Sequence, residues 1–143
     1  MADPIIRKAK ATDAEALLPL NEQLGYPVEL PELRQRLELL IDDPRHFILI
    51  AERKGIPIGW IHVERRLSLE GGAKCEIDGL VVDEAHRGKG IGSKLVAAAI
   101  AWASDHQLPL VVRSNIKREE AHGFYTALGF DRQKSQHVYV KRP

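Results

Sequence analysis

The apolar positions between residues 76 and 105 follow two different periods. A run of strand length comes first, and it ends in the apolar residues Leu80, Val81 and Val82. A short polar turn and a glycine-rich stretch follow, and then apolar residues recur at helical spacing. They are Ile91, Leu95, Ala99 and Trp102. This spacing places them on one face of an α-helix, so the pattern predicts a strand, a glycine-rich turn and a helix, in that order.

The predicted glycine-rich turn has the chemistry of an anion site. Its sequence is Arg87-Gly88-Lys89-Gly90-Ile91-Gly92. Glycines let a backbone come close to a ligand, and the first turn of the following helix offers unpaired N–H groups and about half a positive charge. Arg87, Lys89 and Lys94 add full positive charges. We therefore expect a ligand that carries a phosphate or a pyrophosphate.

Two helices are predicted after a short first strand at residues 5–8. A Thr12-x-x-Glu15 capping box should begin the first helix, and Gly25 should end it. The second helix has Pro31 in its first turn, where proline is well tolerated. Its apolar residues, which share one helical face, are Leu33, Leu37, Leu40 and Ile41.

Three strands joined by short loops should follow these helices. Apolar, β-prone runs span Phe47–Glu52 and residues 58 to about 66, and the Lys54-Gly55 pair between them has the sequence of a hairpin turn. The strand that carries Glu76 comes next. Short connections join antiparallel strands, so we expect an antiparallel meander.

The last part of the chain alternates strand and helix once more. Residues 108–113 form a short apolar strand, and because a whole helix separates it from the strand of Glu76, the two should be parallel neighbours. A helix should run from about 119 to 128, with Gly129 as its left-handed C-cap, and Phe130–Val140 should form a last strand or pair of strands. The predicted class is α+β, with a mixed, largely antiparallel sheet and helices on both faces.

The composition indicates a single globular domain over residues 1–143, with 44% hydrophobic and 29% charged residues. A net charge of +1 gives no basic field for a polyanion, which argues against nucleic acid as a partner. The one cysteine, Cys75, excludes an internal disulfide and favours a reducing compartment. No apolar run approaches the about 20 residues of a membrane span, and the N-terminus has no signal-peptide pattern. We therefore expect a cytoplasmic protein without a membrane partner.

The spacing of the glycines decides among phosphate ligands. In the dinucleotide fingerprint G-x-G-x-x-G, Ser93 would occupy the place of the third glycine, and the Walker sequence G-x-x-x-x-G-K-[ST] does not occur. A nucleotide-binding fold therefore stays an alternative hypothesis, as does a glycine-rich surface turn without a ligand.

Two segments resemble signatures of one enzyme family. Arg87-x-x-Gly90-x-Gly92 is similar to the acetyl-CoA signature Q/R-x-x-G-x-G/A of the GCN5-related N-acetyltransferases. Residues 121–130 read Ala-His-Gly-Phe-Tyr-Thr-Ala-Leu-Gly-Phe and resemble the A-x-x-[FL]-Y-x-x-x-G-F segment of that family. Asn115 stands where the family often has an asparagine after its fifth strand. The predicted order of elements matches the family fold over nearly the whole chain.

The resemblance implies how acetyl-CoA, the co-substrate, would bind. The fourth strand, which carries Glu76, would splay from the fifth strand, which begins near Leu108. The pantetheine arm would lie in this gap and pair with the backbone, while the pyrophosphate would rest on the amides of residues 87–92, with Ser93 beginning the helix. The implied cofactor-binding residues are Leu80, Val81, Val82, Arg87, Gly88, Lys89, Gly90, Ile91, Gly92, Ser93 and Asn115.

The catalytic residues that the resemblance implies are Tyr125 and Glu76. Tyr125 would give a proton to the departing thiolate, and its alternative role is packing. Phe124 should point about 100° away from it and lie in a different environment. Glu76 lies eleven residues before Arg87, the spacing of the base glutamate in histone-modifying members, and would take the proton of the amine directly or through water. Asp78, on the same strand face, is the alternative base.

Other polar residues near Glu76 have less defined roles. His62 and Glu64 share a strand face with Trp60 and could reach Glu76 across the hairpin, as a water relay or a wall of the acceptor site. No third ligand of suitable spacing accompanies them, so we predict no metal site. Cys75 should be a small buried side chain. The remaining histidines should be surface or loop residues.

The expected function is that of an acetyl-CoA-dependent N-acetyltransferase that moves an acetyl group to a primary amine by direct attack on the thioester. A non-catalytic acyl-CoA-binding module is the alternative. The resemblance places the acceptor beside the first two helices and the loop after Arg66. Acidic residues there that would suit a cationic amine are Glu22, Glu29, Glu32 and Glu70. Small-molecule and protein amines both stay open, and so does a homodimer, because many relatives pair.

Overall fold

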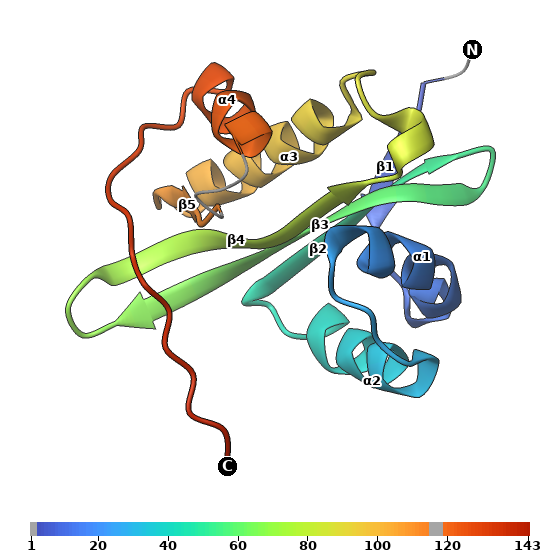
Figure 1. The fold of residues 1–143 in the computed structure, drawn as a ribbon, viewed down its shortest axis with the longest axis horizontal. Coiled ribbons are helices and arrows are strands. Elements are labelled where there is room, and N and C mark those ends of the chain that lie inside the picture. Colours follow the sequence, from blue (N-terminus) through green and yellow to red (C-terminus); the bar gives the residue numbers. More distant parts are fainter. Residues whose placement is uncertain (1–2, 115–118) are drawn as a thin grey trace. The chain divides into compact units, whose positions relative to one another are not determined.

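Five strands form one sheet in the part of the chain that the structure describes (Figure 1). This structure is a computed structural model, and it describes residues 3–114 and 119–143. The strands are β1 (Ile5–Lys8), β2 (His46–Arg53), β3 (Ile56–Ser68), β4 (Gly72–Val82) and β5 (Leu110–Val112), and they lie in that order across the sheet. Neighbours from β1 to β4 pair antiparallel, and β5 runs parallel to β4. The predicted meander, the parallel neighbour and the largely antiparallel α+β class are confirmed.

Helices cover both faces of this sheet. They are α1 (Ala14–Leu24), α2 (Leu30–Ile41) and α3 (Ile91–Asp105), with the short 3-10 turns η1 (Ala11–Asp13) and η2 (Glu84–His86). Figure 1 shows α1 and α2 on one face and α3 on the other. Gly25 ends α1 at a left-handed φ of 97°, and Pro31 lies in the first turn of α2, both as predicted. None of the described helices is long and apolar enough to cross a membrane.

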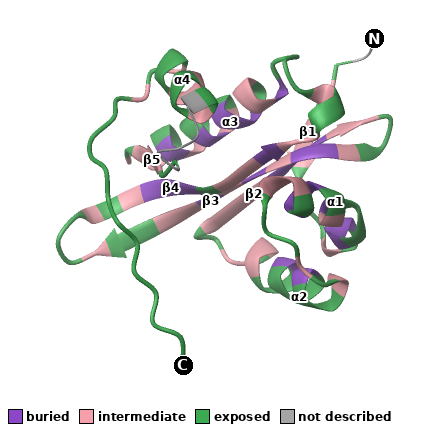
Figure 2. Cartoon of the chain, viewed as in Figure 1, coloured by how far each residue is buried: buried purple, intermediate pink, exposed green. Residues whose placement is uncertain are grey.

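The hydrophobic core has a layer on each side of the sheet. Toward α1 and α2, the strand residues Ile50 and Val81 pack with buried residues of the helices, which are Ala14, Leu17, Leu20, Leu33 and Leu37. Successive residues of a strand point to opposite faces, so Ile61, Val63 and Cys75 face the side that α3 covers. All three are 0% exposed, which confirms the predicted burial of Cys75. Figure 2 shows the buried positions along the strands and on the helices.

The capping box predicted at Thr12 and Glu15 is wrong. The turn η1 comes first, and α1 begins at Ala14 with Asp13 as its N-cap. Asp13 is 8% exposed, and its carboxylate accepts a hydrogen bond of 2.7 Å from the backbone N–H of Lys10. Thr12 lies inside η1, and Asp13 occupies the N-cap position of α1, so the hydroxyl of Thr12 does not cap the helix.

Arg7 of β1 compensates the buried charge of Asp13. Its guanidinium donates to both carboxylate oxygens of Asp13, at 2.7 and 2.8 Å, and to Glu52 of β2 at 2.8 Å. The hydrogen bonds from Arg7 lower the pKa of Asp13 and raise the pKa of Arg7, although burial opposes both shifts. This ion cluster joins β1, β2 and the start of α1.

The pairing between β3 and β4 contains a β-bulge at Asp78. His62 pairs with Gly79 and Val63 pairs with Ile77, so Asp78 is an extra residue in β4. A bulge bends its strand and re-aims the side chain of the extra residue. In β4 it turns Asp78 toward the face on which His62 lies, since their side chains approach each other there.

The strands β4 and β5 separate soon after they pair. Their paired residues are Cys75 with Leu110, Glu76 with Val111 and Ile77 with Val112. β4 continues to Val82, whereas β5 ends at Val112. Among the described residues of β5, none pairs with the part of β4 beyond Ile77. This is the predicted splay between the fourth and fifth strands.

Residues 113–143 form a compact unit of their own. This unit contains α4 (Glu119–Ala127), which was predicted at about 119–128. Gly129 follows with a left-handed φ of 93°. Its N–H donates to the carbonyl of Thr126 and the N–H of Phe130 donates to the carbonyl of Tyr125, both at 3.1 Å. The predicted glycine C-cap is therefore confirmed.

The strands predicted for Phe130–Val140 are wrong. Residues 130–143 are all described, and they adopt neither helix nor strand. The exposed fractions of Val138, Tyr139 and Val140 are 86%, 90% and 69%. A segment becomes a strand only where a neighbouring strand supplies backbone partners, and none of the five described strands pairs with residues 130–140.

Candidate active site

The glycine-rich turn after β4 presents its backbone to solvent. Gly88 and Gly90 have left-handed φ angles of 78° and 80°, and a Cβ added at either would meet nothing within 4 Å. Residues 87–90 are exposed. Gly90 is the N-cap of α3, which begins at Ile91. The expectation that Ser93 begins the helix is wrong, because the left-handed glycine starts it earlier.

The first turn of α3 supplies N–H groups for an anion. The first hydrogen bond inside the helix joins the N–H of Lys94 to the carbonyl of Gly90 at 3.1 Å. The amides of Ile91, Gly92 and Ser93 therefore have no acceptor within the helix. No acidic residue stands in this turn. These amides and the positive end of the helix dipole fit a diphosphate group.

Gln23 of α1 fixes the turn that leads into the glycines. Its side-chain N–H donates to the carboxylate of Asp83 at 2.8 Å, and its side-chain oxygen accepts from the N–H of Glu84 at 2.9 Å. The carboxylate of Asp83 also lies 2.9 Å from Nδ1 of His86. The hydrogen bond from Gln23, followed by that of His86, lowers the pKa of Asp83. The turn η2 is thus tied to α1.

Arg87 spans the start of the same turn. Its Nε donates to the carbonyl of Val82, the last residue of β4, at 2.9 Å. The other two residues predicted to line the pantetheine arm directly precede Val82. Val81 is buried, and Leu80 is half-buried. The backbone of these three β4 residues borders the splay and is not paired with the described residues of β5. It is therefore available for the hydrogen bonds expected from a pantetheine arm.

Three carboxyl groups converge on one face of the sheet. Glu64 of β3 stands directly opposite Glu76 of β4, and Asp78 joins them at the bulge. One carboxylate oxygen of each lies within 4.8 Å of the others. Glu76 is only 6% exposed; a guanidinium nitrogen of Arg66 lies 3.0 Å from its carboxylate, and another lies 3.7 Å from that of Glu64. One arginine thus faces a cluster of three acids, which we call the carboxyl cluster.

Asp78 is the member of the carboxyl cluster that titrates near neutral pH. Burial raises its pKa to about 7, and the charge and hydrogen bond of Glu64 and the charge of Glu76 act in the same direction, against Arg66. A group that is partly protonated at pH 7 suits proton transfer, because it can both accept and release a proton there. The predicted base Glu76 and the alternative base Asp78 therefore lie in one cluster.

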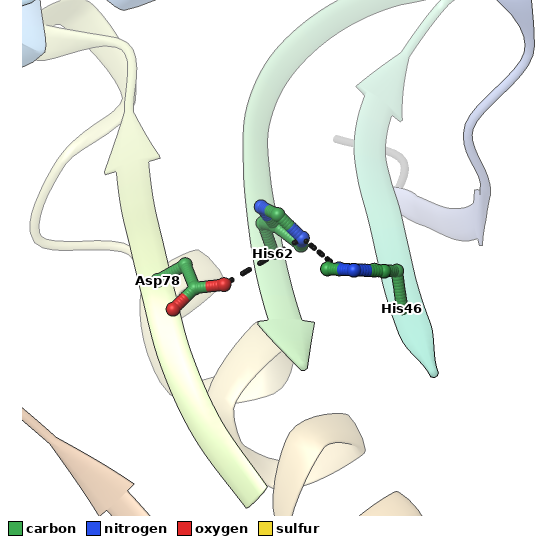
Figure 3. Close-up of side chains that lie close together, drawn as sticks. All are labelled: His46, His62 and Asp78. Carbon is green, nitrogen blue, oxygen red and sulfur yellow. Dashed lines mark hydrogen bonds and ion pairs between the residues drawn. The ribbon is translucent and has the colours of Figure 1, made fainter. Parts of the chain in front are cut away.

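Two histidines extend this cluster across the sheet (Figure 3). Nε2 of His62 lies 2.9 Å from Nδ1 of His46 on β2 and 3.7 Å from Oδ2 of Asp78. Burial, with a smaller effect of His46, lowers the pKa of His62 to about 4, so its imidazole is neutral at pH 7.

The histidine contacts correct two sequence-based expectations. The expectation that every remaining histidine is a surface or loop residue is wrong for His46, which lies in β2 against His62. The expectation that no third ligand accompanies His62 and Glu64 is also wrong, because His46 and Asp78 both lie within reach of His62. The expected approach of Glu64 to Glu76 across the hairpin is confirmed.

Trp60 lies beside the carboxyl cluster on the α1 side of the sheet. Its Nε1 donates to the side-chain oxygen of the buried Asn21 at 3.1 Å. A Cβ added to Gly79 would come within 2.6 Å of the indole ring. The absence of a side chain at Gly79, the neighbour of Asp78, therefore provides the space that the Trp60 ring occupies.

Tyr125 belongs to α4, in the unit formed by residues 113–143. Its ring packs edge-on against Phe124, with centroids 5.1 Å apart, and against Phe130, at 5.5 Å. The expectation that Phe124 and Tyr125 occupy different environments is wrong, because side chains of this size can turn toward each other from adjacent helical positions. The role of Tyr125 as an acid stays a prediction. Asn115, the last predicted cofactor-binding residue, lies outside the described residues.

A sequence model described as the acetyltransferase (GNAT) family matches residues 14–130, a span that includes the carboxyl cluster, the glycine-rich turn and α4. The chain belongs to this family. As a GNAT protein it is an N-acetyltransferase that uses acetyl-CoA, which the resemblance of the glycine-rich turn had predicted.

Relatives of this GNAT chain align with most of its length. Aminoglycoside N(6')-acetyltransferase type 1 of Stenotrophomonas maltophilia is 28% identical over 145 residues, which cover 98% of this chain and 94% of the relative. An uncharacterised N-acetyltransferase of Chlorobaculum tepidum is 31% identical over 129 residues, which cover 90% of this chain and 76% of the relative.

Solved structures share the GNAT fold of this chain. One is AAC(6')-Iy in complex with the bisubstrate analogue CoA-S-monomethyl-acetylneamine, with a TM-score of 0.87, 20% identity, and coverage of 99% of this chain and 100% of that one. This likeness confirms the predicted fold class.

Proposed function

We propose that this GNAT protein moves the acetyl group of acetyl-CoA to a primary amine of a small cationic molecule, by direct attack of the amine on the thioester. The observation that carries the proposal is the carboxyl cluster, which lies on β3 and β4, and β4 leads into the phosphate-binding turn. A cluster of acids attracts an ammonium group, and one of its members can take a proton from that group.

The glycine-rich turn supports the placement of acetyl-CoA. A diphosphate on the amides of residues 87–92 would direct the pantetheine arm back along β4, past Val82 and Leu80. The thioester would then come toward the bulge at Asp78, where the carboxyl cluster lies. A single domain over residues 1–143, a cytoplasmic location and a homodimer stay predictions beside this proposal.

The amine must lose a proton before it attacks. An amine with a lysine-like pKa of ~10.4 is neutral in only about one molecule in a thousand at pH 7. In our proposal Asp78 takes this proton, while Glu76, held by Arg66, helps to attract the ammonium group. The sequence-based alternative, in which Glu76 itself is the base, uses the same cluster and is tested by the same variants.

The reaction then follows from the groups around the thioester. The amine nitrogen forms a bond to the carbonyl carbon, and the oxyanion that results would be stabilised by backbone N–H groups. The C–S bond breaks with its electron pair on sulfur, and the nitrogen, which carries an extra proton after the attack, releases that proton to water. These changes leave the acetylated amine and a thiolate. The thiolate takes a proton from Tyr125 in our proposal, or leaves as the anion.

The relatives support a small-molecule acceptor with several amino groups. The relative in S. maltophilia is named for aminoglycosides, and the analogue bound to AAC(6')-Iy joins CoA to an acetylneamine. In this chain, acidic side chains on or next to α1 and α2 and in the β3–β4 hairpin are exposed to solvent. They are Glu22, Glu29, Glu32 and Glu70. Their charge favours a polycation over a neutral amine.

The proposal is tested by thiol release from acetyl-CoA with an aminoglycoside, a polyamine, a free amino acid and a lysine peptide. We expect turnover with a small molecule that carries several amines. Turnover with the peptide alone would replace the proposed acceptor by a protein amine. Binding of CoA without thiol release for any amine would favour the non-catalytic acyl-CoA-binding module instead.

Variants test the proposed roles of single residues. Removal of a general acid or base costs about 10²–10⁴ in rate, so we expect a loss of this size in kcat for Asp78→Asn. Glu76→Gln should mainly raise KM if Glu76 attracts the ammonium group, and should lower kcat if it is the base. Tyr125→Phe should slow turnover relative to Tyr139→Phe, a control at a side chain that is 90% exposed. Equal rates for these two variants at every pH would remove Tyr125 from the mechanism.

A further inference from the structure

A set of metal-ligating side chains lies beside the carboxyl cluster. His46 of β2, His62 of β3 and Asp78 of β4 each present one ligand atom, and the three atoms lie within 4.8 Å of one another (Figure 3). Nε2 of His62 is 2.9 Å from Nδ1 of His46 and 3.7 Å from Oδ2 of Asp78. The acetyl transfer proposed above uses neither imidazole but does use Asp78, so an ion bound there would compete with the proton that Asp78 takes from the amine.

The strand register explains why these residues meet. His46 pairs with Glu64 and His62 pairs with Ile48, so the two histidines are diagonal neighbours on one face of the β2–β3 hairpin. The bulge in β4 adds Asp78 from the other side. The side chains of His62 and Asp78 are 18% and 25% exposed, so an ion from solvent can reach them.

We propose that His46, His62 and Asp78 bind a divalent transition-metal ion with the ligand preference of Zn²⁺. Two imidazole nitrogens and one carboxylate oxygen, with a fourth position open to water, are the ligand set of an accessible zinc site. With metal–ligand distances of about 2.0–2.2 Å, tetrahedral geometry separates neighbouring ligand atoms by about 3.3–3.6 Å. The observed 2.9 and 3.7 Å bracket this range and the third separation is within 4.8 Å, so side-chain rotations would bring the three atoms to these distances.

The charges around the three ligands favour a cation. The hydrogen bond between the two imidazoles needs one proton between the nitrogens, and a metal ion would take the place of that proton. Glu64 and Glu76 lie next to Asp78 and add negative charge without being required as ligands.

Two other arrangements use some of the same residues. An oxygen-preferring ion such as Mg²⁺ would choose Glu64, Glu76 and Asp78 and would not depend on His46. A metal-free proton relay through Asp78, His62 and His46 would show no saturable metal binding. Removal of His46 separates the first arrangement from the proposed site, and the metal titration of the parent protein separates the second.

The test is a calorimetric titration of the tag-free, chelator-treated full chain with Zn²⁺, together with the absorption spectrum of the Co²⁺-loaded protein. We expect one saturable Zn²⁺ site per chain and a Co²⁺ spectrum of tetrahedral type. His46→Ala should weaken Zn²⁺ binding at least about tenfold, because it removes a ligand. His137→Ala, in the exposed segment after α4, is the matched control and should bind like the parent.

Three results would overturn the site: no saturable Zn²⁺ binding, equal affinity in the parent and His46→Ala, or displacement of Zn²⁺ by Mg²⁺ in tenfold excess. His62→Gln gives a second reading, with circular dichroism to establish that each variant is folded; if His62→Gln does not fold, His46→Ala decides. Calorimetry needs no turnover, so a failure here is independent of the outcome for acetyl transfer.

Discussion

Glu64 and Glu76 stand directly opposite each other on β3 and β4, so two like charges form a cross-strand pair. Such pairs are ordinarily destabilising. Here Arg66 lies against both carboxylates, at 3.7 and 3.0 Å, and Asp78 relieves the remaining repulsion by holding a proton near neutral pH. The cluster is therefore an acidic site whose charge depends on pH.

The first prediction concerns the stability of Asp78→Asn. The pKa of Asp78 rises from 3.8 to about 7 on folding, so the folded chain binds more protons than the unfolded chain between these pH values. The contribution of Asp78 to stability therefore falls as pH rises from about 4 to 7. We expect Asp78→Asn to be more stable than the parent at pH 8, with a difference that vanishes toward pH 4. Urea unfolding with a chelator present measures this.

The pKa of His62 is lowered on folding, which is the opposite direction. This shift does not obscure the comparison, because it is present in both the parent and Asp78→Asn and cancels in the difference of their stabilities. Asp131→Asn, at an exposed residue of the second unit, is the control and should change stability little at either pH. A parent that is more stable than Asp78→Asn at pH 8 would contradict the prediction.

The second prediction concerns the ion cluster of Arg7. Removing one partner of a buried ion pair costs about 3 kcal/mol, so Arg7→Met should lose about this much stability at pH 7. Arg45→Met, which removes an ion pair with Asp43 from an arginine that is 66% exposed, should cost much less stability than Arg7→Met. Urea unfolding of both variants measures the contrast.

The same variants have a defined pH dependence. Folding lowers the pKa of Asp13 below its ordinary 3.8, so the stabilisation by Arg7 is present above that value and is lost as pH falls further. The deficit of Arg7→Met relative to the parent should therefore shrink below about pH 4. A deficit that is constant from pH 7 to pH 2 would show that packing, and not charge, accounts for the loss.

The third prediction separates backbone strain from cofactor binding. Gly88 has a φ of 78° and Gly72, at the β3–β4 hairpin, a φ of 71°, and both have open space around an added Cβ. Replacement by alanine should therefore cost each variant about 1–2 kcal/mol of stability. Only Gly88→Ala should weaken CoA binding, since our proposal places the diphosphate on the amides of that turn. Calorimetric titration with CoA decides, and equal affinity for both variants would remove the turn from the binding site.

The fourth prediction concerns the contact between Gly79 and Trp60. An added Cβ at Gly79 would come within 2.6 Å of the indole, so Gly79→Ala must displace the ring and should cost about 1–3 kcal/mol. The displacement would also stretch the hydrogen bond to Asn21, and tryptophan fluorescence should report it. Gly123→Ala, inside α4 with nothing within 4 Å, should instead stabilise its helix by about 0.5–1 kcal/mol.

Local patterns predicted most of the elements correctly. The glycine-rich turn, the helix after it and the C-cap at Gly129 depend on neighbouring residues, so their signals are visible in the sequence. The strand predicted at Phe130–Val140 failed because a strand also needs a partner, which the run itself does not contain. The start of α1 was misplaced because Asp13, and not Thr12, is the N-cap and forms the ion pair with Arg7 of β1.

The site at His46 depends on register, which the sequence does not display. Counting outward from the Lys54-Gly55 turn would pair His46 with Val63 and send its side chain to the opposite face. An irregularity between Ala51 and Glu52 shifts the pairing, so His46 stands opposite Glu64. The bulge at Asp78 has a similar effect on β4. Two such irregularities decide which titratable groups meet.

The two hydrogen bonds of the Gln23 side chain link the expected acceptor side of the protein to the turn before the glycine-rich stretch. The helix that carries Gln23 is expected to border the acceptor, yet the side-chain amide of Gln23 also anchors the turn before the glycines to which we assign the diphosphate. Transplanting this helix from a relative, in order to change which amine is acetylated, would therefore also change the hold on CoA unless a glutamine or an equivalent came with it. Evolution of a new acceptor preference in this lineage is constrained in the same way.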